Sequence, residues 1–97
     1  MLLTADQVQQ ALATLPGWTG DTEQLVLEHQ FASFPDAILG VAAVASAAER
    51  LDHHPDIDIR WRTVTFRLST HTAGGVTEKD TDAAAVFDLV LGRTSAP

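Results

Sequence analysis

The sequence predicts an α+β fold: a four-stranded antiparallel sheet with three helices packed on one face, in the order α-β-β-α-β-β-α. Three segments carry apolar residues at the spacing of an amphipathic helix, and between them lie two pairs of strand-like segments with alternating apolar and polar residues. The alternation leaves one face of the strands polar, which is typical of an antiparallel sheet covered on one side. A length of 97 residues fits one domain, residues 1–97.

The first helix and the first hairpin are predicted from local signals. Thr4 and Gln7 form a capping-box pattern, and Pro16-Gly17 ends the helix that follows. Residues 24–31 then alternate as a half-buried strand, and residues 18–19 are the candidate first arm of a hairpin with it.

The central helix is predicted over residues 34–52. Ser33 is a good N-cap, and Pro55 must end the helix at or before His54, because the residue before a proline avoids helical angles. Apolar residues surround most of this helix, so we expect it to be buried on more than one side. One side can pack on the sheet, and the other can meet a second subunit.

The second hairpin is predicted from a change in the alternation of apolar and polar residues. Residues 56–61 alternate cleanly, and residues 64–68 alternate on the opposite parity. A tight turn at Trp61-Arg62, or a bulge, would explain the change. The second strand is expected to end at Thr70-His71.

The last helix is expected to begin at Thr77, which with Asp80 forms another N-cap pattern, and to continue to about Leu91. The terminal residues 93–97 are expected to be frayed.

Composition excludes several classes of function. The chain has no cysteine, so thiolate metal sites, disulfide scaffolds and cysteine nucleophiles are excluded. A formal charge of −7 argues against nucleic-acid binding, which needs a basic patch. The N-terminus lacks the basic region of a signal peptide, and the longest apolar run is too short to span a bilayer. We therefore expect a cytoplasmic protein with no membrane partner.

Three of the four histidines lie between Glu49 and Asp80, among several carboxylates. Three interpretations are open. The histidines could be general acids or bases, because their ordinary pKa near 6.5 suits proton transfer at neutral pH. They could bind a metal, although the neighbouring His53 and His54 cannot easily hold one ion together. They could also be structural, with Asp80 capping a helix. The fourth histidine, His29, lies on an apolar strand face and is most simply a packed residue.

The same stretch closely resembles the pterin-4a-carbinolamine dehydratases. The family pattern has an acidic residue, a His-His-Pro triplet, an aromatic residue, a further histidine, and an aspartate after a glycine loop. The matching residues here are, in register, Glu49, His53-His54-Pro55, Trp61, His71 and Asp80. Neighbouring residues, Thr70 among them, also look like the family, and the resemblance covers about four-fifths of the chain. The fold of the family agrees with the order of elements predicted above.

The resemblance implies dehydration of 4a-hydroxytetrahydrobiopterin, or a related pterin carbinolamine, to quinonoid dihydropterin, in support of an aromatic amino acid hydroxylase that uses tetrahydrobiopterin. It implies a pterin substrate and no metal or other cofactor. His53 and His71 would be the acid and base, and His54 would mainly hold the pterin. The remaining site residues would bind or orient: Glu49, Asp52, Thr70, Asp80 and Trp61, the last of which either lines the site or packs.

The resemblance also implies a homodimer or homotetramer, which agrees with the largely apolar central helix. An alternative function is a non-catalytic homodimeric protein-interaction module. Some animal members of the family act as nuclear transcriptional coactivators, but no feature of this sequence supports that role.

Overall fold

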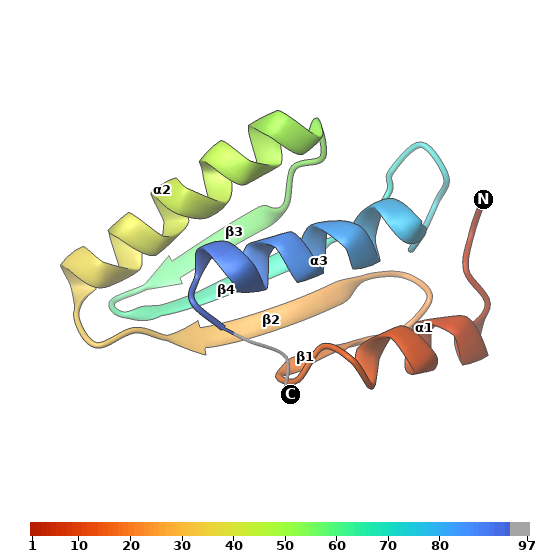
Figure 1. The fold of residues 1–97 in the computed structure, drawn as a ribbon, viewed down its shortest axis with the longest axis horizontal. Helices are drawn as coiled ribbons and strands as arrows, with labels where there is room; N and C mark the ends of the chain where they lie inside the picture. The colour runs from red at the N-terminus through yellow and green to blue at the C-terminus, as the bar shows by residue number, and fades with distance from the viewer. Residues whose placement is uncertain (94–97) are drawn as a thin grey trace.

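The computed structural model describes residues 1–93, and Figure 1 shows its seven elements in the predicted order. The predicted fraying of residues 94–97 lies outside the described residues. The bounds of the elements are α1 Ala5–Leu12, β1 Trp18–Gly20, β2 Leu25–Gln30, α2 Phe34–Leu51, β3 Asp56–Arg60, β4 Thr63–Leu68 and α3 Glu78–Val90.

The four strands form one antiparallel sheet in the order β1-β2-β4-β3. Helices α2 and α3 lie side by side across one face, and α1 lies beside β1 (Figure 1). All three helices contribute to one hydrophobic core, so the α+β fold predicted from the sequence is confirmed. The largest apolar side chains buried in that core are Phe66, Phe87, Leu25, Leu27, Leu68, Val8, Val44, Val64 and Val76.

The predicted turn between the last two strands is also confirmed. Arg60 pairs with Thr63, so only Trp61 and Arg62 remain in the turn and no bulge is needed. Trp61 has φ of 54°, which is uncommon for a bulky residue. The Arg62 guanidinium lies 4.7 Å from the centre of the Trp61 ring, in a cation–π contact that favours this conformation.

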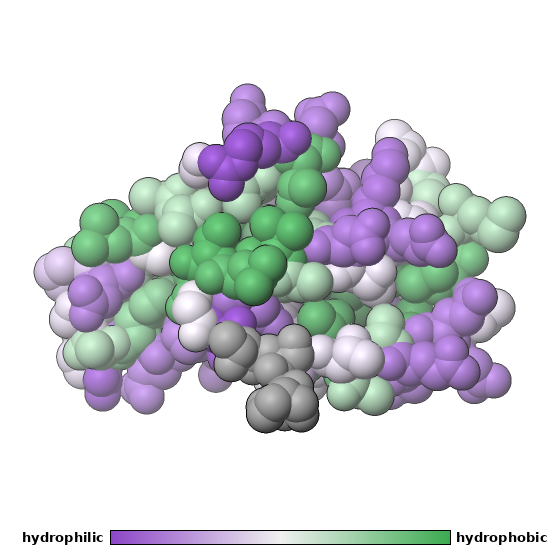
Figure 2. Space-filling model, in the orientation of Figure 1, coloured by the Kyte–Doolittle hydropathy of each residue, from purple (hydrophilic) through white to green (hydrophobic). Residues whose placement is uncertain are grey.

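The buried face of helix α2 is narrower than its apolar composition indicates. Its small residues Ala37, Val44, Ala47 and Ala48 face the core. Larger apolar residues near the start of the helix, such as Phe34 and Ile38, remain almost half exposed. Figure 2 shows hydrophobic surface gathered on this helix-covered side of the molecule. The chain thus keeps an apolar surface that its own residues do not cover.

Arg93, predicted to be frayed, is instead firmly held. Its guanidinium donates one hydrogen bond to the Pro16 carbonyl and another, of 3.1 Å, to Asp88 Oδ1. A third guanidinium nitrogen lies 3.1 Å from His29 Nδ1. Asp88 also accepts from the Trp18 indole N–H at 2.9 Å, and its side chain is buried. The prediction was wrong for Arg93 because two of its partners, Pro16 before β1 and His29 on β2, lie far from it in sequence.

This network makes the stability of the protein depend on pH. Burial and the neighbouring Arg93 guanidinium lower the pKa of His29, against the opposing effect of Asp88. The folded chain therefore keeps His29 neutral at pH values where the unfolded chain, with a histidine pKa of about 6.5, binds a proton. We expect the free energy of unfolding to fall as the pH drops below about 6.5.

Urea denaturation of the wild type and of His29→Gln between pH 5 and pH 8 measures this contribution. The variant should lose less stability between neutral and acidic pH than the wild type. The same pH dependence in both proteins would contradict the assignment to His29.

Candidate active site

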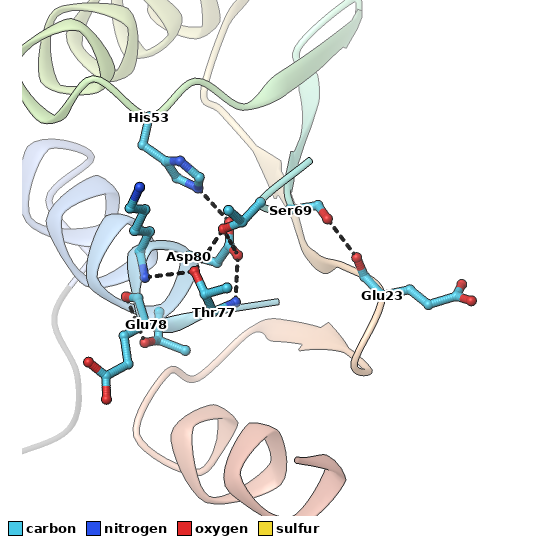
Figure 3. A network of polar contacts seen from close by, with 9 residues as sticks. Glu23, His53, Ser69, Thr77, Glu78 and Asp80 are labelled. Atoms are coloured by element: carbon cyan, nitrogen blue, oxygen red, sulfur yellow. Dashed lines mark hydrogen bonds and ion pairs between the residues drawn. The ribbon is translucent and has the colours of Figure 1, made fainter. Parts of the chain in front are cut away.

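The end of α2 is shaped by one residue in the left-handed conformation. Asp52, the C-cap, has φ of 51° and ψ of 42°. The backbone N–H of His53 then donates back to the Ala48 carbonyl at 3.1 Å, as in a Schellman-type helix end. Pro55 prevents the helix from continuing. The chain therefore leaves the helix axis at His53, whose ring turns toward the start of α3 (Figure 3).

This helix end gives a stability prediction. An L-residue in the left-handed region costs about 1–2 kcal/mol, but aspartate tolerates it better than alanine, and glycine pays no steric cost. We expect Asp52→Ala to lower the free energy of unfolding by about 1 kcal/mol and Asp52→Gly to preserve or raise it. Urea denaturation checks this; equal losses in the two variants would show that the aspartate side chain, rather than the backbone angle, matters.

A buried carboxylate joins α2, the end of β4 and the start of α3. His53 Nε2 lies 2.6 Å from Asp80 Oδ1, and the Asp80 side chain is fully buried. The other oxygen, Oδ2, accepts from the Thr70 hydroxyl at 2.8 Å and from the Thr77 backbone N–H at 2.9 Å. Figure 3 shows His53 pointing at Asp80, with Thr77 on the other side of the carboxylate. Asp80 thus caps α3 and binds a histidine at once.

The donor and the acceptor of each hydrogen bond in this network can be assigned. Thr70 uses its hydroxyl proton on Asp80, so at the 2.7 Å contact between the two threonine hydroxyls it must accept from Thr77. The Thr77 hydroxyl oxygen in turn accepts from the Lys79 backbone N–H. An ionised Asp80 can only accept, so His53 carries its proton on Nε2. The neutral ring therefore has its lone pair on Nδ1.

The other two histidines are more exposed. His54 Nε2 lies 2.7 Å from Glu49 Oε1, and both side chains are largely in solvent. His71 lies in a tight turn closed by the pairing of Thr70 with Gly75. Its ring makes no hydrogen bond to any of residues 1–93. The predicted strand end at Thr70-His71 is therefore moved: β4 stops at Leu68, because Thr70 turns its hydroxyl to Asp80 and its backbone to Gly75.

All three histidines line one open cleft of about 310 Å³, between the end of α2, the turn after β4 and the start of α3. Of the other residues proposed from the sequence, Asp52 and Thr70 line it, Asp80 lies behind His53, and Glu49 contacts His54. The cleft is lined by Asp52, His53, His54, Ser69, Thr70, His71, Thr72 and Lys79. The three element ends that carry the histidines thus meet.

Trp61 is the exception among the predicted site residues. It precedes β4, whereas the cleft begins after β4 ends, and a six-residue strand is about 20 Å long. Trp61 is also 70% exposed, in the turn at the far end of the sheet. It therefore does not line the cleft of its own chain.

Lys79 is a cleft residue that sequence reasoning missed. It is the only lysine of the chain, and it lies inside the stretch that carries the histidines. Its place in the first turn of α3, between the residues that cap that helix, is the signal that could have found it. Ser69 and Thr72 were also missed as cleft residues, and neither carries a comparable signal.

Two further observations concern metal binding and membrane-spanning helices. Within residues 1–93, no group of three or more histidine, aspartate or glutamate side chains is arranged to hold a metal ion. Over the same residues, no helix is both long enough and apolar enough to cross a membrane.

The chain is similar to one family of known proteins. The family model described as pterin 4 alpha carbinolamine dehydratase matches residues 1–90. A protein of Mycobacteroides abscessus is 54% identical over 95% of this chain and 98% of its own length, and one of Nocardia farcinica is 55% identical over 90% and 92%. Both carry the provisional name pterin-4-alpha-carbinolamine dehydratase.

Two solved structures have a similar fold. A Brucella melitensis protein described as a transcriptional coactivator/pterin dehydratase has a TM-score of 0.89 and 33% identity, over 95% of this chain and 100% of that chain. A pterin dehydratase-like protein described as a RuBisCO assembly factor of the α-carboxysome has a TM-score of 0.66, over 79% of this chain and 89% of its own. Its identity of 23% supports the fold alone.

Proposed function

We propose that this chain, which belongs to the pterin-4-alpha-carbinolamine dehydratase family, removes water from a 4a-hydroxytetrahydropterin to give quinonoid dihydropterin. The observation that carries the proposal is the cleft in which three histidines meet, one of them held by a buried carboxylate. Such an arrangement provides an acid and a base for proton transfer. The similar Brucella melitensis protein is described as a transcriptional coactivator as well as a pterin dehydratase, so activity is the property to test.

The reaction needs two proton transfers. Hydroxide is a poor leaving group, so an acid gives a proton to the 4a oxygen as the C4a–O bond breaks. The N5 lone pair forms the new C4a–N5 double bond, and a base removes the proton on N5. One proton is added and one is removed, and the products are water and quinonoid dihydropterin. These transfers are within reach of imidazole groups alone.

His53 is best suited to be the base. Its Nε2–H is held by Asp80, so the neutral ring offers a lone pair on Nδ1. When Nδ1 takes a proton, the ring becomes positive, and the buried carboxylate 2.6 Å away stabilises that charge. A carboxylate that orients a histidine and stabilises its imidazolium has this role in other acid–base sites.

His71 is then the acid. Its exposed ring, in the turn after β4, can exchange protons with solvent and return to the imidazolium form after each turnover. His54, held by Glu49, and the Thr70 and Asp52 side chains would bind and orient the pterin. We propose that an aromatic amino acid hydroxylase, whose reaction yields the carbinolamine, supplies the substrate, which makes a tetrahydrobiopterin derivative the natural one.

The direct test is to mix the protein with freshly made 4a-hydroxytetrahydropterin and follow the loss of carbinolamine absorbance. The wild type should accelerate it well above the rate in buffer, and His29→Gln, which changes a histidine outside the cleft, should do the same. A rate no faster than buffer from a folded protein would overturn the proposal and favour the non-catalytic interaction module.

We also propose that the chain forms a homodimer or homotetramer through α2 and β3. Strand β3 is an edge of the sheet, and its Ile57 and Ile59 are more than a third exposed. Together with Phe34 and Ile38 of α2, they provide apolar area that a second copy can cover.

Sedimentation velocity checks the contact. Burying one such side chain contributes about 1.5–3 kcal/mol, so Ile59→Glu should raise the dissociation constant at least tenfold. Leu89→Glu, which changes an exposed leucine of α3, is the matched control and should have a smaller effect. A wild-type monomer at micromolar concentration would contradict the proposal.

A further inference from the structure

The histidine cleft of one chain has no apolar wall. Apart from the three histidines, its lining residues are all hydroxylic or charged: Asp52, Ser69, Thr70, Thr72 and Lys79. A pterin is a planar double ring, and sites for molecules of this kind usually place an apolar or aromatic face against the ring. Among residues 1–93, no tryptophan, phenylalanine or aliphatic side chain lines this cleft. The cleft therefore holds groups for proton transfer but lacks a surface on which the ring can stack.

Trp61 is an exposed aromatic residue without a role in its own chain's cleft. Its ring is 70% exposed and contacts the Arg62 guanidinium in the turn between β3 and β4. This turn lies at one end of β3, and the segment 53–55 lies at the other end (Figure 1). If two copies of β3 pair antiparallel across a two-fold axis, the turn of each chain comes to lie beside the histidine segment of the other.

The outer edge of β3 has the backbone groups that such pairing needs. Among residues 1–93, β3 has β4 on one side and no strand on the other. The Phe31 N–H donates to the Arg62 carbonyl at 2.8 Å, so the alternating pattern assigns the even-numbered residues of β4 to β2 and the odd-numbered ones to β3. Opposite the even-numbered residues lie Ile57 and Ile59. Their N–H and C=O groups therefore point outward, toward a second copy.

One register pairs the whole of β3. With Asp58 on the two-fold axis, all five residues of the strand have a partner. Asp56 then lies opposite Arg60 of the partner subunit, which joins opposite charges twice in the dimer. Ile57 lies opposite the partner's Ile59, so the exposed isoleucines cover each other. The two Asp58 carboxylates meet at the axis, where the Nε atom of Arg60 in the same chain lies 3.1 Å from each of them.

Other registers are less favourable. Centring the pairing on Ile57 would place Asp56 opposite the partner's Asp58, and like charges directly opposite each other are destabilising. Centring it on Ile59 would pair only residues 58–60, because the chain leaves the strand at Trp61, where φ is 54°. A slip of one residue would bring the helix-covered face of one strand against the open face of the other.

We propose that Trp61 of each protomer completes the histidine cleft of its partner and provides the aromatic wall for the substrate ring. In the register centred on Asp58, Trp61 lies opposite Pro55 of the partner subunit, with the two backbones about 5 Å apart. The neighbouring His54 side chain is 56% exposed, so the indole ring has space to cover it. This inference rests on the proposed function and on the proposed contact through β3. Each site then needs two chains.

Single cysteine variants test the register, because the chain has no cysteine of its own. Asp58→Cys should form a covalent dimer under mild oxidation, since the two copies of residue 58 would have Cα atoms about 4.5 Å apart, within the range of a disulfide. Asp56→Cys is the matched control on the same face of β3. Its two copies would lie about 13 Å apart along the strand, so it should stay uncrosslinked on a non-reducing gel. Any other pattern would overturn the register and the inference.

Mixing two defective variants tests the contribution of Trp61. We expect Trp61→Ala to lower kcat/KM about tenfold and Trp61→Phe, which keeps an aromatic ring, to retain most of it. His53→Ala lacks the proposed base but keeps Trp61. When the subunits of Trp61→Ala and His53→Ala exchange, half of the intact histidine sites gain a partner with Trp61. The activity of an equimolar mixture should therefore rise about fivefold above the mean of the two separate proteins.

The contrary outcomes are distinct. With exchange confirmed from differently tagged chains, a mixture at the mean activity would show that Trp61 does not act on the partner's cleft. Wild-type kcat/KM in Trp61→Ala would remove Trp61 from the site altogether. No turnover by the wild type would overturn the proposed function and the role of Trp61 with it, while the cysteine variants would still decide the register of β3.

Discussion

Replacing His53 with alanine is expected to lower kcat/KM for the dehydration by about 10²–10⁴-fold, the usual contribution of one general acid or base. The variant keeps the cleft but loses the Nδ1 lone pair that Asp80 orients. His29→Ala is the matched control, because it removes a histidine outside the cleft.

The pH dependence of the remaining activity assigns the two roles. A base must be unprotonated, so the loss of activity on the acidic side of the wild-type profile should disappear in His53→Ala. An acid must be protonated, so the loss on the alkaline side should disappear in His71→Ala. The reverse pattern would exchange the roles of the two histidines. Near wild-type activity in His53→Ala would contradict the proposed mechanism.

Replacing Asp80 with asparagine is expected to lower turnover by up to about 10⁴-fold, the loss that a wrong histidine tautomer causes in a Ser-His-Asp site. The amide oxygen can still accept from the Thr77 N–H and cap α3. The amide NH₂ then donates to His53 Nε2 and moves the ring proton to Nδ1, where the lone pair is needed. We therefore expect a folded protein of nearly normal stability that has lost most of its turnover.

Asp80→Ala separates this effect from folding. It removes the cap and leaves the buried Thr77 N–H and Thr70 hydroxyl without their acceptor. We expect the free energy of unfolding to fall by about 2–4 kcal/mol, measured by urea denaturation. If Asp80→Asn were as unstable as Asp80→Ala, its loss of activity would no longer report on the tautomer. If Asp80→Asn stayed fully active, the orienting role of Asp80 would be excluded.

Much of the fold could be predicted because its signals are local. The opposite parity of residues 56–61 and 64–68 predicted a turn at Trp61-Arg62, and the structure has that turn. Pro55 predicted a helix end, and α2 ends at Leu51. The prediction for Arg93 failed, because two of the partners that hold it, Pro16 and His29, come from distant segments.

The sequence by itself determined the order of the elements and the stretch in which the histidines lie, because hydrophobic periodicity and helix breakers act over a few residues. Only the tertiary structure decided which of those residues share a cleft. It placed Asp80 against His53, 27 residues away, brought in Lys79, and left Trp61 at the far end of the sheet. Such contacts depend on how helices pack on a sheet, and that packing is set by the whole core rather than by any single segment.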